Sequence, residues 1–169
     1  MLQPLVRRTW AERGQTPALE QWGRRDRTSV IAALVLSPQR RHVQLFFELL
    51  DHNAKAEDFV WFLNALRRDV RRPLHVVWDN LGAHRKAENG LRKIGCRWVR
   101  FHRLPPYAPE LNPVEHVWTT AKWGHLAGVV PGDRAELRDQ VAGQLNRQSL
   151  EQRLLRSHFR WARLDLRIV

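Results

Sequence analysis

Two carboxylates, Asp79 and Glu115, stand at positions from which side chains could bind metal ions. Asp79 follows an apolar, strand-like run, and open α/β sheets place their sites at the carboxyl ends of central strands. Glu115 falls in the first turn of a predicted helix, with 35 residues between the two. Because carboxylate oxygens are preferred ligands of Mg²⁺, the pair predicts metal-dependent phosphodiester chemistry. Such a site needs a third carboxylate, for which the sequence offers no good candidate.

Each carboxylate also has a purely structural explanation. Asp79 and Asn80 could simply open a turn, as this pair of residue types does well. Asn112 is a good helix N-cap, Pro113 suits the first helical position and Glu115 falls at the third, so a capping box could explain all three. Capping does not explain the rigid Pro-Pro-Tyr-Ala-Pro segment that precedes them and fixes where the helix begins.

Three polar residues near the carboxylates are candidates for supporting roles. His84 lies five residues after Asp79 in a predicted loop, where a histidine more often has a structural role. Asn80 and Asn112 are next to the predicted strand end and the predicted helix start. We interpret Asn80, His84 and Asn112 as supporting residues of the site.

The charge of the chain predicts a polyanionic partner. Its net charge is +12 at pH 7 and its pI is about 11.4, which favours nucleic acid. Of the 29 basic residues 25 are arginines, which suit bidentate contacts with phosphates. A genome rich in G and C would also favour arginine codons, so the arginines could merely coat a surface. The cations that we expect to bind DNA are Arg7, Arg8, Arg13, Arg85, Lys86 and Lys122.

The composition also restricts the compartment. Cys96 is the only cysteine, which excludes an internal disulfide and a thiolate metal cluster. The longest apolar run, Val30 to Leu36, is too short to span a bilayer, and no signal peptide is predicted. We expect a cytoplasmic, nucleoid-associated protein without a membrane partner.

The elements that would position these residues alternate between strands and helices. Apolar runs predict strands over residues 28–36, 42–50, 74–78 and 97–103. Helical periodicity predicts helices over residues 54–68, 85–94, 113–126 and 134–146, and residues 149–169 read as a basic segment. This order predicts an α/β fold in which helices pack on one mixed sheet.

Three segments together resemble DDE transposases of the IS630/Tc1/mariner superfamily, in particular the bacterial IS630-type catalytic domain. Residues 7–17 resemble a family segment that reads Arg-Thr-Trp-Ala-Pro-Arg-Gly-Gln-Thr-Pro, with Glu12 in place of its proline. Residues 76–84 resemble the segment that bears the second catalytic aspartate, here Asp79. Residues 104–118 resemble the segment that bears the last catalytic residue, here Glu115, and this third match is highly specific.

The resemblance implies an RNase H-like fold and a two-metal mechanism. Two divalent ions, Mg²⁺ or Mn²⁺, would be held by three carboxylates, of which Asp79 and Glu115 are two. The reaction implied is cleavage of DNA at the ends of a mobile element, followed by strand transfer into target DNA that contains the dinucleotide TA.

The chain departs from this family at the first catalytic aspartate. In the family that residue lies on an opening strand before the Arg-Thr-Trp segment, whereas Asp26 and Asp51 follow that segment and do not correspond to it. We therefore interpret residues 1–169 as a single catalytic domain without its opening strand and without the N-terminal helix-turn-helix region. We expect weak metal binding and little or no activity, and exposed strand edges favour a homodimer or poor solubility.

Two other classes of protein remain open. One is a non-catalytic remnant, a basic module that binds DNA or pairs with a full-length copy without cutting. The other is a different RNase H-like nuclease, such as a resolvase, with the same fold and another substrate. Metal-dependent nicking separates the enzymes from the remnant, and strand joining into DNA that contains TA separates the transposase from the nuclease.

Overall fold

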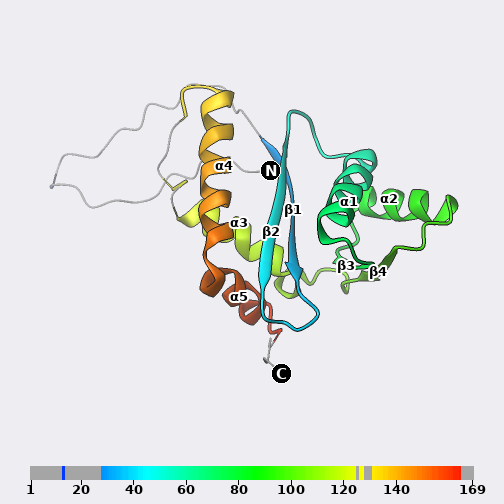
Figure 1. The fold of residues 1–169 in the computed structure, drawn as a ribbon. Helices are drawn as coiled ribbons and strands as arrows, with labels where there is room; N and C mark the ends of the chain where they lie inside the picture. The colour runs from blue at the N-terminus through cyan, green and yellow to red at the C-terminus, as the bar shows by residue number, and fades with distance from the viewer. Residues whose placement is uncertain (1–12, 14–27, 125, 128–130, 165–169) are drawn as a thin grey trace.

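A computed structural model describes residues 13, 28–124, 126–127 and 131–164 (Figure 1). These residues form four strands, five α-helices and a short 3-10 helix, η1 (Pro109–Leu111), so the predicted α/β class is confirmed. The strands are β1 (Ser29–Leu36), β2 (Val43–Leu50), β3 (Leu74–Trp78) and β4 (Val99–Arg103). The helices are α1 (Ala56–Val70), α2 (Gly82–Lys93), α3 (Pro113–Trp123), α4 (Arg134–Leu150) and α5 (Gln152–Trp161).

The strands pair as two separate sheets. β1 and β2 form an antiparallel hairpin in which Ser29 lies opposite Leu50, and β3 and β4 are parallel, with Trp78 opposite Arg103. The described strands thus include both antiparallel and parallel pairs, as expected of a mixed fold, but they are paired as two small sheets. The apolar pattern of a strand predicts that it is buried, but which strands pair depends on contacts between distant parts of the chain. Within the described ranges, β1 and β3 each have one edge without a strand partner.

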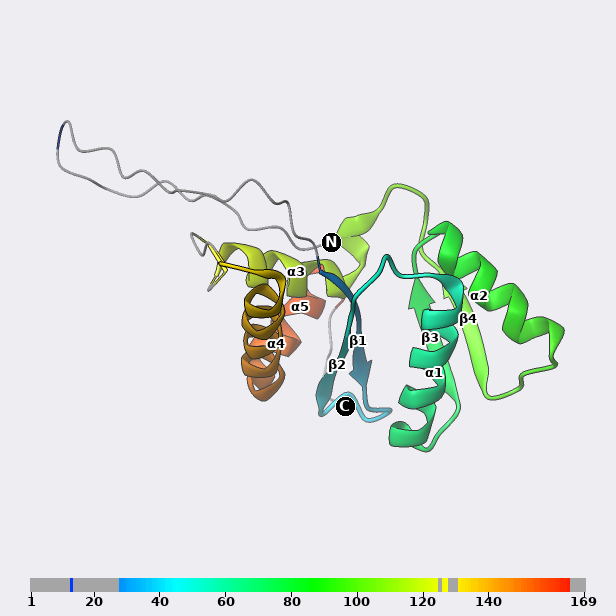
Figure 2. The ribbon, with the colours of Figure 1, turned by 90° about the horizontal axis from the view of Figure 1, so that it is seen from above.

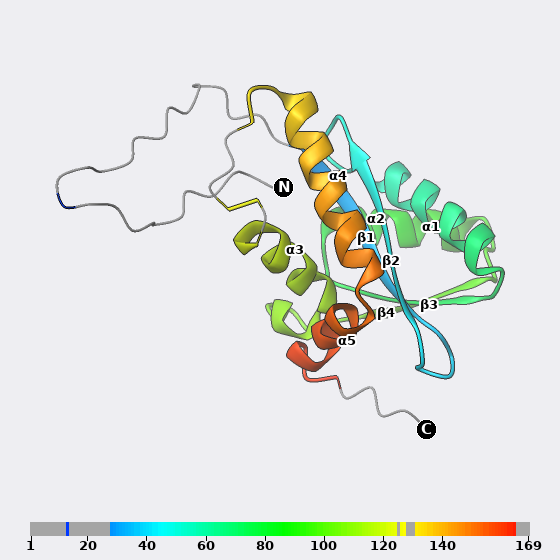
Figure 3. The ribbon, with the colours of Figure 1, turned by 60° about the vertical axis from the view of Figure 1, so that its left-hand side comes forward.

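The hairpin lies between two helical layers, as Figures 2 and 3 show. Helices α3, α4 and α5 cover one of its faces, where Leu34 and Phe47 pack against the first core. On the other face of the hairpin, Ala33, Val35 and Phe46 pack against the second core, on the side where α1 and α2 lie. Because both faces of β1 are covered, its sequence is a continuous apolar run rather than an alternating one. The first core is formed by Val43, Leu45, Val117, Ala121, Leu126, Leu137, Val141, Leu145, Leu155 and Phe159. The second core is formed by Leu63, Leu66, Leu74, Trp78, Ala87, Leu91 and Val99.

The helices follow the predicted order, but α2 and α5 differ from the prediction. Helix α2 begins at Gly82, three residues before the predicted start at residue 85. Helix α5 forms within the segment that was predicted only as basic, because Leu155 and Phe159 lie one turn apart and are both buried in the first core. No helix in the described part of the chain is long and apolar enough to cross a membrane.

A buried histidine on α5 makes the stability of the fold depend on pH. His158 is only 1% exposed, and its Nε2 atom has no hydrogen-bond partner among the residues that the structure describes. Burial lowers the pKa of His158 from 6.5 to about 4, and the nearby charge of His116 adds to the effect. The unfolded chain therefore takes up this proton at a higher pH than the folded protein does. The resulting stability is complete above pH 6.5 and is lost as the pH falls toward 4.

We expect this histidine to lower the free energy of unfolding by up to about 3 kcal/mol across that pH range. Urea unfolding at a series of pH values measures the effect. His158→Gln removes the titrating group, so the variant should lose less stability on acidification than the wild type. His42→Gln, at an exposed position before β2, should keep the wild-type pH dependence. Equal acid sensitivity of His158→Gln and the wild type would contradict this assignment.

Candidate active site

Asp79 is placed by the end of strand β3. The strand ends at Trp78, which is buried in the second core, and the Asp79 side chain that follows is 53% exposed. One oxygen of this carboxylate, Oδ1, accepts hydrogen bonds from His84 Nδ1 at 2.7 Å and from the Leu81 backbone N–H at 2.9 Å. Asp79 does shape the turn into α2, as the structural explanation required. Among the described residues its second oxygen, Oδ2, has no hydrogen-bond donor.

Asn80 fixes the chain that leaves β4 beside the end of β3. Its Nδ2 donates to the Leu104 carbonyl at 3.0 Å, and the Leu104 N–H donates to the Trp78 carbonyl at 2.9 Å. The proline-rich loop therefore starts next to the residue that precedes Asp79. This arrangement gives Asn80 a clear positioning role between the two predicted segments.

The loop then leads through η1 to the start of α3. Asn112 is the N-cap of α3: its Oδ1 accepts from the Val114 N–H at 3.2 Å, and Pro113 occupies the first turn. The predicted start of this helix is confirmed. Its end is not, because α3 stops at Trp123 rather than near residue 126.

Glu115 does not complete the capping box. In such a box its carboxylate would accept from the Asn112 N–H, but that N–H donates to the Pro109 carbonyl at 2.9 Å. The Glu115 side chain is exposed, and in the described ranges its carboxylate has no hydrogen-bond partner. Helix capping thus accounts for Asn112 but leaves the carboxylate of Glu115 free for another role.

His84 lies in a cage of aromatic rings. It stacks on Trp78 with ring centroids 4.6 Å apart and an angle of 5° between the planes. Phe59 of α1 meets His84 edge to face at 4.4 Å and 82°, and Trp78 stacks in turn on Phe101 of β4 at 4.8 Å. The side chain of His84 is only 15% exposed. Four elements, α1, β3, α2 and β4, therefore fix the ring that bonds to Asp79.

Tyr107 is the exposed tip of the proline-rich loop. Its backbone φ is +57°, in the left-handed region that non-glycine residues seldom adopt, and the residue is fully exposed. Three nearby prolines, Pro105, Pro106 and Pro109, restrict the loop around it. The packing of the described residues gives no reason for a large aromatic side chain at this position.

Tyr107→Gly is expected to raise the free energy of unfolding by about 0.5 to 1 kcal/mol, because glycine adopts a positive φ without steric cost. Denaturant unfolding provides the measurement. The matched variant Tyr107→Ala removes the same ring but keeps the unfavourable backbone, so it should show no gain. If glycine destabilises the protein as much as alanine does, the ring makes contacts that stabilise the fold.

The predicted DNA-binding cations have different places. Arg85 and Lys86 are exposed on the first turns of α2, next to His84, and Lys122 is half-buried on α3. None of these three pairs with a carboxylate in the described part of the chain. Arg13 is an exposed residue in a turn, and the remaining two, Arg7 and Arg8, lie outside the described residues.

Asp79 and Glu115 do not by themselves make a complete metal site. No group of three His, Cys, Asp or Glu side chains with the arrangement of a metal site occurs among them. Asp51 is engaged elsewhere, since its Oδ1 accepts from Arg138 at 2.9 Å and lies 3.6 Å from Arg134. Asp26 lies outside the described residues.

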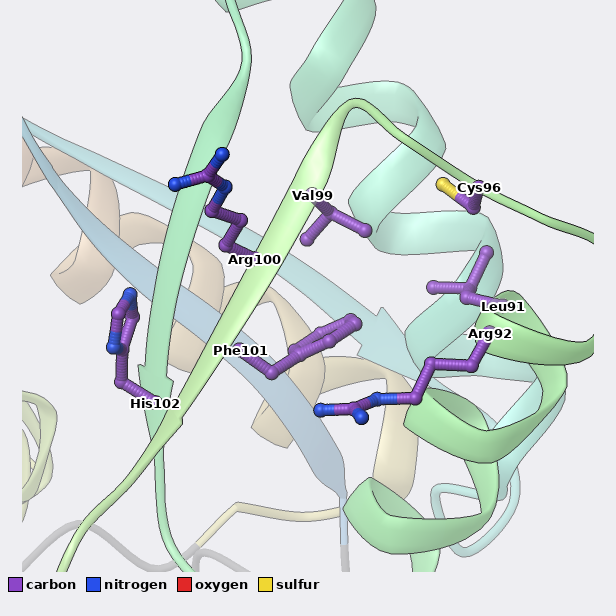
Figure 4. Close-up of a pocket in the computed structure, with 7 residues that line it drawn as sticks. All are labelled: Leu91, Arg92, Cys96, Val99, Arg100, Phe101 and His102. Carbon is purple, nitrogen blue, oxygen red and sulfur yellow. The ribbon is translucent and has the colours of Figure 1, made fainter.

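A pocket of about 370 Å³ lies along β4, and neither Asp79 nor Glu115 is among the residues that line it (Figure 4). Leu91, Arg92 and Cys96 line one side of the strand, and Arg100 and His102 lie on the other. Its lining contains no acidic side chain, so it has no ligand set for Mg²⁺.

Comparison with known proteins identifies the family. The family described as DDE superfamily endonuclease matches residues 1–138, which include Asp79, Glu115 and the loop between β4 and α3. No curated protein and no solved structure matches the chain significantly. The mixed α/β fold is consistent with an RNase H-like domain of this kind. The match covers most of the chain, which therefore belongs to the DDE superfamily endonucleases.

Proposed function

We propose that this chain is the catalytic domain of an IS630-type DDE transposase, in which Asp79 and Glu115 are metal ligands. The observation that carries the proposal is the state of Glu115. Its carboxylate lies in the first turn of α3 without a partner among the described residues, although the sequence around it is that of a capping box. The Asn80 bond to Leu104 ties the loop that leads to this helix to the strand end that bears Asp79.

The donor chemistry of the two residues fits Mg²⁺ or Mn²⁺. Both cations prefer carboxylate oxygens, and Asp79 would bind through Oδ2, because Oδ1 already accepts two hydrogen bonds. When bound, a pair of such ions supplies Lewis-acid stabilisation of the attacking and leaving oxygens of a phosphodiester. The chain's own residues orient this site: His84 and Leu81 hold Asp79, Asn80 holds the loop, and Asn112 sets the start of α3.

The third carboxylate would come from a strand outside the described residues. Two observations support this part of the proposal. The described residues hold no group of three metal-binding side chains, and each of the four described strands has an edge at which a further strand could pair. We therefore expect Asp79 and Glu115 by themselves to bind a divalent ion only weakly. Unpaired strand edges are also surfaces at which two copies could associate, so a homodimer is part of the proposal.

The proposed substrate is DNA, namely element ends and a target containing TA, bound in the cytoplasm and in association with the nucleoid. Support comes from the net charge of +12 and from the exposed Arg85 and Lys86 close to Asp79. Arginine and lysine bind phosphates without reading sequence, so these cations would position the backbone rather than choose the site.

Replacing Arg85 and Lys86 with glutamine should reduce the salt dependence of DNA binding. Loss of two phosphate contacts lowers the slope of log K against log salt by about 2. Fluorescence anisotropy of a labelled duplex at several salt concentrations provides the measurement. Arg68 and Arg72 are also exposed and precede the N-terminal end of β3, whereas Asp79 follows its C-terminal end. Replacing both with glutamine is therefore the matched control. Equal slopes for the two double variants would show that the α2 cations do not contact DNA preferentially.

A second candidate is a DNA-binding remnant that does not cut, favoured by the lack of a third carboxylate among the described residues. Nicking of supercoiled plasmid in Mn²⁺ separates the two candidates. Slow nicking that is lost in both Asp79→Asn and Glu115→Gln supports the enzyme, and tight, salt-dependent DNA binding without any nicking supports the remnant. Nicking that survives both substitutions shows that the site assignment is wrong.

The same assay extends to the choice between transposase and another RNase H-like nuclease. A labelled oligonucleotide with a free 3′-hydroxyl is offered together with target DNA that contains or lacks TA. Joining to the TA-containing target supports the transposase, whereas cleavage without joining supports the nuclease.

A further inference from the structure

We propose that His84 is a positioning residue for Asp79, one that holds Oδ1 and thereby turns Oδ2 toward the metal ion. This inference rests on the proposed function, because it concerns the same site. In this account the His84 side chain, which is only 15% exposed, determines which oxygen of the Asp79 carboxylate is available to the ion. His84 itself binds neither metal nor DNA in this account.

The first step of the argument is that the direction of the His84 ring does not depend on Asp79. Trp78 lies parallel to the imidazole at 4.6 Å, and Phe59 meets it edge to face at 4.4 Å. A ring enclosed on these sides has little freedom to rotate, and its side chain is only 15% exposed. The aromatic packing therefore fixes the plane of the imidazole, and Nδ1 of the ring held in this way lies 2.7 Å from Asp79 Oδ1.

The second step concerns the unequal use of the two carboxylate oxygens. Oδ1 accepts from both His84 Nδ1 and the Leu81 N–H, while Oδ2 has no donor in the described part of the chain. An ionised carboxylate has about two acceptor positions on each oxygen. Two donors on Oδ1 therefore leave Oδ2 as the oxygen available to a cation. In metal sites, partners of this kind orient the ligand, and their removal costs about 10- to 100-fold in metal affinity.

The third step is that the spacing of the chain makes this contact possible. His84 lies in the first turn of α2, and side chains in a helix lean toward its N-terminus, which here faces the end of β3. Trp78 contributes twice, since it stacks on His84 and precedes Asp79 in the chain. Phe101 of β4 also stacks on Trp78, which adds β4 to the support.

The test is Mn²⁺ binding, followed by the electron paramagnetic resonance signal of free Mn²⁺ in titrations of the whole chain. His84→Phe keeps an aromatic ring in the cage but removes the donor, and it should weaken Mn²⁺ binding at least about ten-fold. His84→Asn returns an amide donor near the position of Nδ1 and should restore most of the affinity. His84→Gln carries its amide one bond further out, near the position of Nε2, and should not.

The Asn and Gln variants keep the test decisive if the Phe variant folds poorly, because both lose the same ring. His42→Phe is the control for adding an aromatic ring at an exposed histidine, and it should bind Mn²⁺ as the wild type does. If Asp79→Asn abolishes binding while His84→Phe and His84→Gln bind normally, this inference is wrong and the proposed function stands. If Asp79→Asn binds Mn²⁺ normally, the proposed metal site itself is wrong.

Discussion

Trp78→Ala is expected to lower the free energy of unfolding by about 3 to 5 kcal/mol, the usual range when a large aromatic side chain is removed from a core. Trp78 is buried in the second core and stacks on both His84 and Phe101. Its removal would leave a cavity between α1, α2 and β4 that rigid neighbours cannot fill. Urea unfolding monitored by far-UV circular dichroism measures the loss without relying on tryptophan fluorescence.

The same substitution should also weaken Mn²⁺ binding by the folded protein. Without Trp78 the His84 ring loses its parallel neighbour, so the donor to Asp79 Oδ1 is no longer fixed. Trp78→Phe keeps an aromatic surface and should recover part of both losses. Normal Mn²⁺ affinity in a folded but destabilised Trp78→Ala protein would show that the aromatic stack does not orient the site.

Leu145→Ala should cost about 2 to 5 kcal/mol of unfolding free energy without changing Mn²⁺ affinity. Leu145 is fully buried on α4 in the first core, on the other side of the hairpin from the aromatic stack. Leu145→Ala and Trp78→Ala should lose similar amounts of unfolding free energy, but they remove side chains from different cores. It therefore separates a general loss of folding from a specific effect on the strand end.

The expected pattern is that both variants unfold more easily while Trp78→Ala alone binds the metal ion more weakly. Titrations are made at a temperature at which each variant is still folded, as judged by circular dichroism. Equal losses of Mn²⁺ affinity in the two variants would show that the site responds to overall stability rather than to the ring beside His84.

Local signals in the sequence predicted most of the elements that carry the site. The strand over residues 74–78 and the start of α3 at Pro113 agree with the structure, because each depends on nearby residues. A short apolar run fixes the strand, and an asparagine followed by proline fixes the helix start. The prediction of a capping box was correct for Asn112 but not for Glu115, since the Asn112 N–H donates to the Pro109 carbonyl instead of to the Glu115 carboxylate.

Two helices differ from what we predicted. The segment that contains α5 is rich in arginine and was predicted only as basic, although its apolar residues do recur at helical spacing, and Leu155 and Phe159, one turn apart, are buried in the first core. Packing of that face, rather than helix propensity, stabilises such a helix. The other helix, α2, was predicted to begin at residue 85 but begins at Gly82, and the backbone N–H of the preceding Leu81 donates to Asp79 Oδ1.

The parts of the site that sequence could not predict are those built from distant residues. The cage around His84 joins Phe59, Trp78 and Phe101, which lie on three separate elements. No spacing along the chain predicts that these rings meet. The pairing of the strands into two sheets is likewise a property of the folded molecule, because apolar runs predict strands and not their partners.

The most direct test of the central claim is a crystal structure of the chain soaked in Mn²⁺, with anomalous diffraction used to locate the ion. The account predicts an anomalous peak within coordination distance of Asp79 Oδ2 and the Glu115 carboxylate, which disappears in crystals of Asp79→Asn. A peak bound only by other residues, or carboxylates of Asp79 and Glu115 too far apart to share an ion or an adjacent pair of ions, would contradict it.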